Sequence, residues 1–84
     1  MDLNTLEEQL RIAKAHVVLG NEHIACQREL VSILEQAGKD ASAAKQLLKL
    51  FHKLQEVHVA EAWKLSIQLV SIAASDQNEV LTGR

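Results

Sequence analysis

The strongest constraint on the fold is a repeat of apolar residues at alternating spacings of three and four along residues 3–37. This is the heptad rhythm of helices that pack against each other along their length. The 84 residues include no proline, and proline is the residue that most strongly interrupts a helix. The sequence therefore predicts an all-α protein built from long helices of the coiled-coil type.

Residues 3–37 carry two such seams side by side. The first seam consists of Leu3, Leu6, Leu10, Ala13, Val17, Gly20, Ile24, Gln27, Val31 and Leu34. The second seam consists of Ile12, His16, Leu19, His23, Cys26, Leu30, Ile33 and Ala37. Together the seams cover an arc of roughly 150°, which is wider than one partner helix needs.

One strong break divides the chain, in the stretch "QAGKDAS" at 36–42. Gly38 suits the left-handed position after a helix end, and Asp40 suits the next N-cap. Near the start, Asn4 and Thr5 each have a glutamate three residues on, which is capping-box spacing. The predicted bounds are helices at about 4–37 and 40–75, a frayed tail at 76–84, and one domain over 1–84.

The second predicted helix has one central seam and a further apolar row. The seam consists of Ala44, Leu48, Phe51, Gln55, His58, Ala62, Leu65, Leu69 and Ile72. The row includes Trp63, Ile67 and Val70, and we expect it to form a dimer interface. A single antiparallel hairpin leaves this row and the second seam uncovered, so the sequence predicts a homodimer in the form of a four-helix bundle. The alternative is a hairpin that docks on an unidentified protein partner.

Folding the hairpin about Gly38 pairs positions whose numbers sum to about 78. This register predicts that Gly20 lies opposite His58 and that His16 lies opposite Ala62. A glycine inside a helix costs about 1 kcal/mol relative to alanine, and room for an imidazole would explain it. The predicted polar layer of the core consists of His16, Gly20, His23, Gln27, Gln55 and His58.

Two interpretations of this layer remain open. The first is a buried hydrogen-bond network that fixes register and partner choice. The second is a bundle that binds a metal or small cofactor through His16, His23 and His58, because neutral imidazoles are common ligands of transition metals. The Glu-x-x-His pairs of di-iron bundles do not occur, so the sequence predicts no cofactor.

Other functional classes find little support in the residues. We see no nucleophile with a base, phosphate loop or carboxylate pair, and expect no enzymatic activity. A phosphotransfer role for His23 or His52 lacks a supporting motif. Cys26 is expected to be a small core residue. The Lys45, Lys49 and Lys53 stripe is expected to be a solvated surface.

Composition narrows the partners and the compartment. The net charge of −2 and the pI near 6.0 favour neither nucleic acid nor an anionic membrane. One cysteine fits a reducing cytosol. The acidic opening "MDLNTLEEQL" is unlike a signal peptide, and no apolar run approaches 18 residues. We therefore expect a cytoplasmic protein.

Residues 16–65 resemble a family of short uncharacterised bacterial helical-hairpin proteins. The resemblance rests on a His-x3-Gly-x2-His-Ile-x2-Gln-Arg run and a later Gln-x2-His-x-Ala run. The matching residues are His16, Gly20, His23, Ile24, Gln27, Arg28, Leu34, Glu35, Gly38, Asp40, Leu47, Leu48, Phe51, Gln55, His58 and Ala60. The family continues with an Arg- and Asp-rich stretch, where this chain has "EAWKL". The resemblance implies a hairpin and adds no activity, which leaves a small, non-enzymatic interaction or regulatory module.

Overall fold

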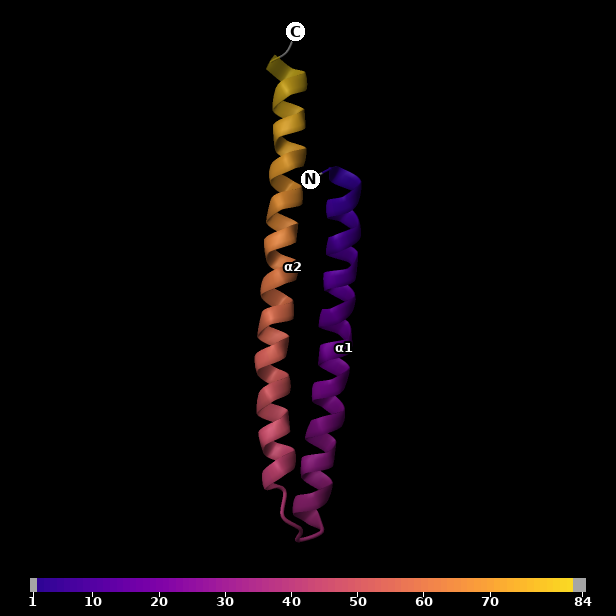
Figure 1. Ribbon diagram of the computed structural model, residues 1–84, viewed down its shortest axis with the longest axis vertical. Coiled ribbons are helices and arrows are strands. Elements are labelled where there is room, and N and C mark those ends of the chain that lie inside the picture. Colours follow the sequence, from indigo (N-terminus) through magenta and orange to yellow (C-terminus); the bar gives the residue numbers. More distant parts are fainter. Residues whose placement is uncertain (1, 83–84) are drawn as a thin grey trace.

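The chain forms an antiparallel hairpin of two long helices (Figure 1). This computed structural model describes the backbone of residues 2–82 and the side chains of residues 2–75. Helix α1 spans Leu3–Gln36 and α2 spans Ser42–Thr82, and the hairpin is 72 Å long. The described residues contain no strand. The all-α hairpin predicted from the heptad pattern is confirmed.

The first turn of α1 is capped by an aspartate that precedes the predicted cap. Asp2 is the N-cap, and its Oδ1 accepts a hydrogen bond of 2.7 Å from the backbone N–H of Thr5. The Asp2 carbonyl also accepts the first helical bond, from the Leu6 N–H at 3.1 Å. The predicted capping role of Asn4 and Thr5 is wrong because both lie inside the helix.

The end of α1 follows the prediction for Gly38. This glycine has φ +71°, in the left-handed region that suits a residue without a Cβ. Its N–H donates to the Glu35 carbonyl at 3.0 Å, and the Lys39 N–H donates to the Leu34 carbonyl at 2.9 Å. These two bonds form a Schellman motif, which satisfies the last carbonyls of the helix.

Asp40 assists the start of α2 from two residues before the helix. Its Oδ1 accepts hydrogen bonds from the Ser42 backbone N–H at 3.0 Å and from the Ser42 hydroxyl at 2.6 Å. These bonds lower the pKa of the Asp40 carboxyl, the hydroxyl contributing more than the backbone. Between Asp40 and the helix, Ala41 is buried.

Helix α2 continues beyond its predicted end. The sequence suggests a frayed tail at 76–84, but the backbone is helical through Thr82. The predicted helix end at about residue 75 is therefore wrong, while fraying of the tail stays a prediction. Residues 76–82 contain no proline or glycine. Residues 83 and 84 lie outside the described residues.

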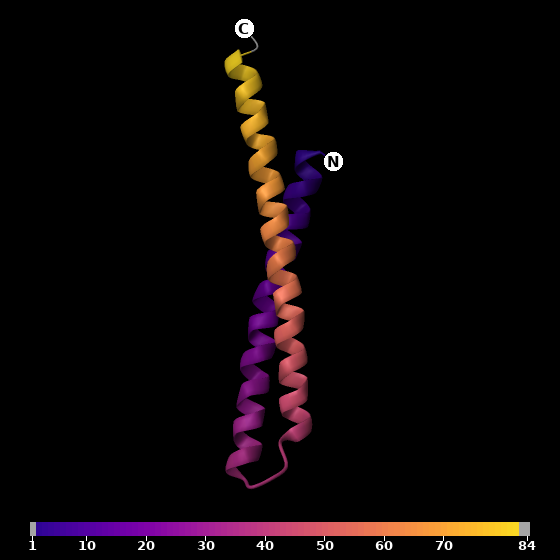
Figure 2. The same ribbon diagram turned by 90° about the vertical axis from the view of Figure 1, so that its left-hand side faces the viewer.

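The register of the two helices differs from the predicted one by about a turn. His16 packs beside His58, and His23 beside Phe51, so contacting positions sum to 74 instead of 78. The four-residue difference is about one helical turn. Figure 2 shows that α1 extends further toward the loop end than α2. The connecting segment rises from the end of α1 to the start of α2 (Figure 2), which accounts for the shift.

Two halves of the hairpin differ in their interior. In the terminal half, residues 3–15 and 59–75, a dry cluster joins Leu6, Leu10, Ala13 and Leu65, with Leu6 only 1% exposed. In the loop half, residues 16–58, the buried residues include two amides. The buried residues of that half are Ile24, Gln27, Val31, Ala41 and Gln55.

Candidate interaction surface

Gln55 is the best-connected polar side chain between the helices. Its Nε2 donates to the Val17 carbonyl at 2.7 Å and to Asn21 Oδ1 at 2.9 Å, which uses both amide hydrogens. Its Oε1 is buried without a partner and lies 1.8 Å from where a Cβ on Gly20 would stand. The predicted pairing of Gly20 with His58 is wrong, because the glycine makes room for the Gln55 amide.

Gln27 forms the second amide contact between the helices. Its side chain is 8% exposed, and its Nε2 donates to the Ala44 carbonyl at 3.0 Å. A register sum of 78 would place Gln27 opposite Phe51, and the shift of one turn brings it to Ala44 instead. The predicted burial of Gln27 and Gln55 is nevertheless confirmed.

The histidines lie at the rim of this layer, outside the core. His16 and His23 are exposed and His58 is half-buried in the single hairpin, so their placement in the core of a four-helix bundle stays a prediction. The rings of His16 and His58 are 5.4 Å apart between centroids, tilted by 51°. The His23 ring lies 6.0 Å from that of Phe51. Both exposed histidines belong to the second seam, which lies beside the helix contact and not within it.

The described part of the chain does not gather three potential metal ligands. No group of three His, Cys, Asp or Glu side chains there could hold a metal ion. The three candidate histidines separate into the His16–His58 pair and His23 beside Phe51. Cys26 is exposed in the single hairpin, so its place in the core of a bundle stays a prediction.

The second seam of α1 forms one half of a broad apolar face. The other half comes from α2, where leucine and valine recur at spacings of three and four on the same side of the hairpin. We call this surface the apolar face. It consists of His16, Leu19, His23, Cys26, Leu30, Ile33, Leu47, Leu50, Leu54 and Val57.

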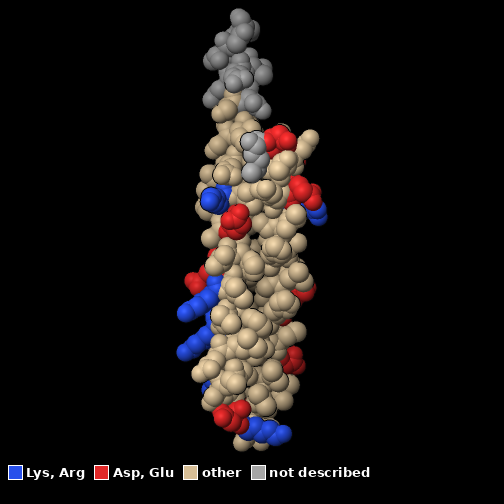
Figure 3. Space-filling model, viewed as in Figure 1, with Lys and Arg blue, Asp and Glu red and all other residues tan. Residues whose placement is uncertain are grey.

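This apolar face is free of charge and open to solvent. Its leucine, isoleucine and valine side chains range from 41% exposed for Leu47 to 64% for Val57. Figure 3 shows the face from the front, with the Lys, Arg, Asp and Glu side chains along its edges and at its two ends. The α2 part of the face was missed by sequence reasoning, although the spacing of Leu47, Leu50, Leu54 and Val57 carries the same signal.

The terminal half presents polar residues on the same side. The corresponding heptad positions there hold Thr5, Gln9, Glu61, Lys64, Gln68 and Ser71, and the apolar exception is Ile12 of the second seam, which is 43% exposed. All six polar side chains are exposed. The apolar face therefore ends where the dry core of the terminal half begins.

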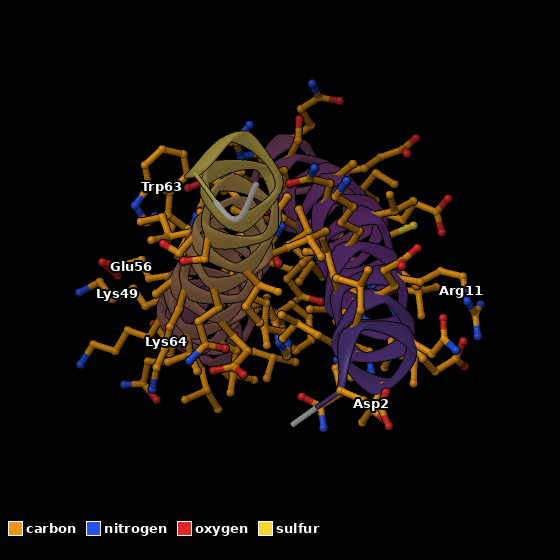
Figure 4. All side chains as sticks on the ribbon, turned by 90° about the horizontal axis from the view of Figure 1, so that it is seen from above. Asp2, Arg11, Lys49, Glu56, Trp63 and Lys64 are labelled. Atoms are coloured by element: carbon orange, nitrogen blue, oxygen red, sulfur yellow. The ribbon has the colours of Figure 1, made fainter. Side chains whose placement is uncertain are left out.

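Trp63 lies on a different side of α2 from Lys64 (Figure 4). Its side chain is 67% exposed, as is that of Val70. The indole borders a shallow groove whose lining includes Lys14 and Val18 of α1. The row predicted as a dimer interface (Trp63, Ile67 and Val70) is thus solvent-exposed in the hairpin, and its role in assembly stays a prediction.

Comparison with protein-family models, curated proteins and solved structures finds no match to this chain. The resemblance of residues 16–65 to a bacterial hairpin family therefore stays a prediction. Within the described residues, neither helix contains a stretch long and apolar enough to cross a membrane.

Proposed function

We propose that the protein is a non-enzymatic interaction module that self-associates through the apolar face into a dimeric four-helix bundle. The observation that carries the proposal is a charge-free strip that crosses both helices in the loop half. Contiguous apolar patches of this kind are uncommon on monomeric proteins and mark interaction sites. Charged edges beside an apolar centre also match the anatomy of protein interfaces.

The size of the face fits a second copy of the chain. The face spans residues 16–33 of α1, about 26 Å at 1.5 Å per residue, and the hairpin is 17 Å wide. Its projected area is therefore roughly 450 Å² per copy, and two such faces give ~900 Å², the size of a small interface. A second copy brings a face of the same shape and the same lack of charge, as an isologous dimer requires.

The separation of apolar and polar halves favours one arrangement of the copies. When both loops lie at the same end and the hairpins overlap along their full length, the loop half of one copy covers the loop half of the other. An antiparallel arrangement with full overlap would instead place Glu61 and Lys64 against the leucines of the other copy. Burial of an unpaired charge is costly, so we propose loops at the same end.

The compartment proposed for this module is a reducing cytoplasm. Cys26 is the single cysteine of the sequence, and unpaired thiols are typical of compartments that glutathione and thioredoxin keep reducing. The bacterial origin implied by the family resemblance agrees with this proposal.

Matched charge substitutions on the two exposed apolar surfaces test the proposal. Leu54 and Val70 are 48% and 67% exposed, so each accepts a glutamate without disturbing the core. We expect Leu54→Glu to convert a dimer into a helical monomer, and Val70→Glu to remain dimeric in sedimentation velocity. The reverse result would assign the interface to the Trp63 row and overturn the proposal.

A further inference from the structure

His16 and His58 come from different helices and meet at the edge of the apolar face. Their ring centroids are 5.4 Å apart. In a tetrahedral zinc site with Zn–N bonds of about 2.0–2.1 Å, the centres of two imidazole rings stand roughly 5 Å apart. The observed spacing therefore suits two ligands of one ion, although it also falls in the range of tilted aromatic pairs.

The surroundings of His58 provide a second, independent observation. His58, His23 and Gln55 line one hollow of about 70 Å³ above Gly20. The Gln55 side chain is 8% exposed, and its Oε1 lacks a partner. A metal-bound imidazole usually donates its other ring N–H to an acceptor, which fixes the ring orientation, and Gln55 precedes His58 by about one turn of α2.

Two imidazoles leave a tetrahedral ion half-coordinated, and the described part of one chain offers no third His, Cys, Asp or Glu ligand. The proposed dimer supplies the missing ligands. With loops at the same end, equivalent residues lie at the same height, so the His16–His58 pair of one copy faces that of the other. This step rests on the proposed function.

We propose that the His16–His58 pairs of two copies form a four-imidazole site for one zinc-like transition-metal ion per dimer. Imidazole ligands suit ions such as Zn²⁺, Cu²⁺ and Ni²⁺. His23 packs against Phe51 and is not a ligand. The ion joins the two hairpins at the boundary between the apolar and polar halves of the face.

Zinc titration with single histidine variants tests this site. We expect isothermal titration of the full chain with ZnCl₂ to end at one ion per two chains. His16→Gln and His58→Gln should each weaken zinc binding by at least about tenfold, since even the loss of a residue that only supports a ligand has an effect of that order. His52→Gln is the matched control, because His52 lies away from the apolar face and should leave binding unchanged.

Cobalt and chelator measurements separate this site from the proposed function. Bound Co²⁺ should give the visible absorption bands of tetrahedral coordination, and His58→Gln should remove them. An endpoint of one ion per chain, or unchanged binding by His58→Gln, would overturn the site. If chelator-treated protein sediments as a dimer that binds no zinc, the inference fails and the proposed function stands. A protein that is monomeric with and without zinc would contradict both the zinc site and the proposed function.

Discussion

The two halves of the hairpin differ in where they place their apolar side chains, in the interior or on the outer face. The terminal half has a dry interior around Leu6 and Leu65 and a polar front. The loop half joins its helices partly through the amides of Gln27 and Gln55, and it leaves a row of leucine and valine side chains of α2 exposed. The residues that hold the hairpin together therefore differ from those that we assign to the partner surface.

The largest effect on the hairpin itself should come from the terminal half. Leu65 is 5% exposed and packs in the cluster with Leu6, Leu10 and Ala13. Leu65→Ala should lower the free energy of unfolding by about 2–5 kcal/mol, because the substitution removes buried area and leaves a cavity. Urea denaturation followed by circular dichroism measures this loss.

The matched control for Leu65→Ala is Leu54→Ala in the loop half, where the leucine is 48% exposed. Its effect should depend on protein concentration, since we expect it to weaken association more than the hairpin. Equal, concentration-independent losses for both variants would erase the distinction between the halves.

Gly20→Ala should destabilise the loop half through its contact with Gln55. The added Cβ would lie 1.8 Å from Gln55 Oε1, so the Gln55 side chain must move and loosen its bonds to Val17 and Asn21. We expect a loss of about 1–3 kcal/mol by overpacking, although alanine is the better helix former. Thermal unfolding provides the measurement.

Gln55→Ala removes the obstacle and provides the rescue for that experiment. In the Gln55→Ala background, Gly20→Ala should be neutral or stabilising, because only its helix propensity remains. A penalty of the same size in both backgrounds would show that Gly20 and Gln55 do not interact.

Gly38→Ala should also destabilise the hairpin, but the expected cost has a different physical cause. Nothing lies within 4 Å of a Cβ built on Gly38, but its φ is +71°. The expected loss is about 1 kcal/mol, from the left-handed backbone alone. Because no side chain is displaced, no second substitution should rescue it, and a rescue by Asp40→Ala would contradict this view.

The smallest effect should be the pH dependence of the Asp40 cap. Hydrogen bonds from Ser42 hold the pKa of this carboxyl below its usual value. Its stabilisation is therefore complete above the unfolded-state pKa of about 4 and disappears as pH falls through the folded-state pKa. Asp40→Ala should melt below the wild type at pH 7 and together with it in strong acid. A gap that persists in acid would show that the carboxylate charge is not the cause.

The helix bounds and the register show what the sequence could and could not predict. Heptad spacing and Gly38 were sufficient for the hairpin, because apolar period and a left-handed residue are local signals. The register was wrong by one turn because the path of residues 38–41 depends on packing, including the burial of Ala41. Because of this shift, Gly20 lies against Gln55 instead of His58, and the histidines lie at the rim of the polar layer.

Only the α1 part of the apolar face could be predicted from the sequence. The second seam of α1 stood out because two seams on one helix exceed what one partner can cover. The matching row of α2 lies beside a complete central seam, so its contribution becomes clear only when both helices are seen to share one side of the hairpin. His16, His23 and Cys26 lie in that outer face, where the heptad spacing of the second seam predicts a core position.

Sedimentation equilibrium of the unmodified protein tests the central claim most directly. The chain mass is 9.3 kDa, and we predict that the protein at micromolar concentration, with chelator present, has the mass of two chains. Circular dichroism of the same sample should show a helical protein. A helical species with the mass of one chain over the full concentration range would contradict self-association through the apolar face.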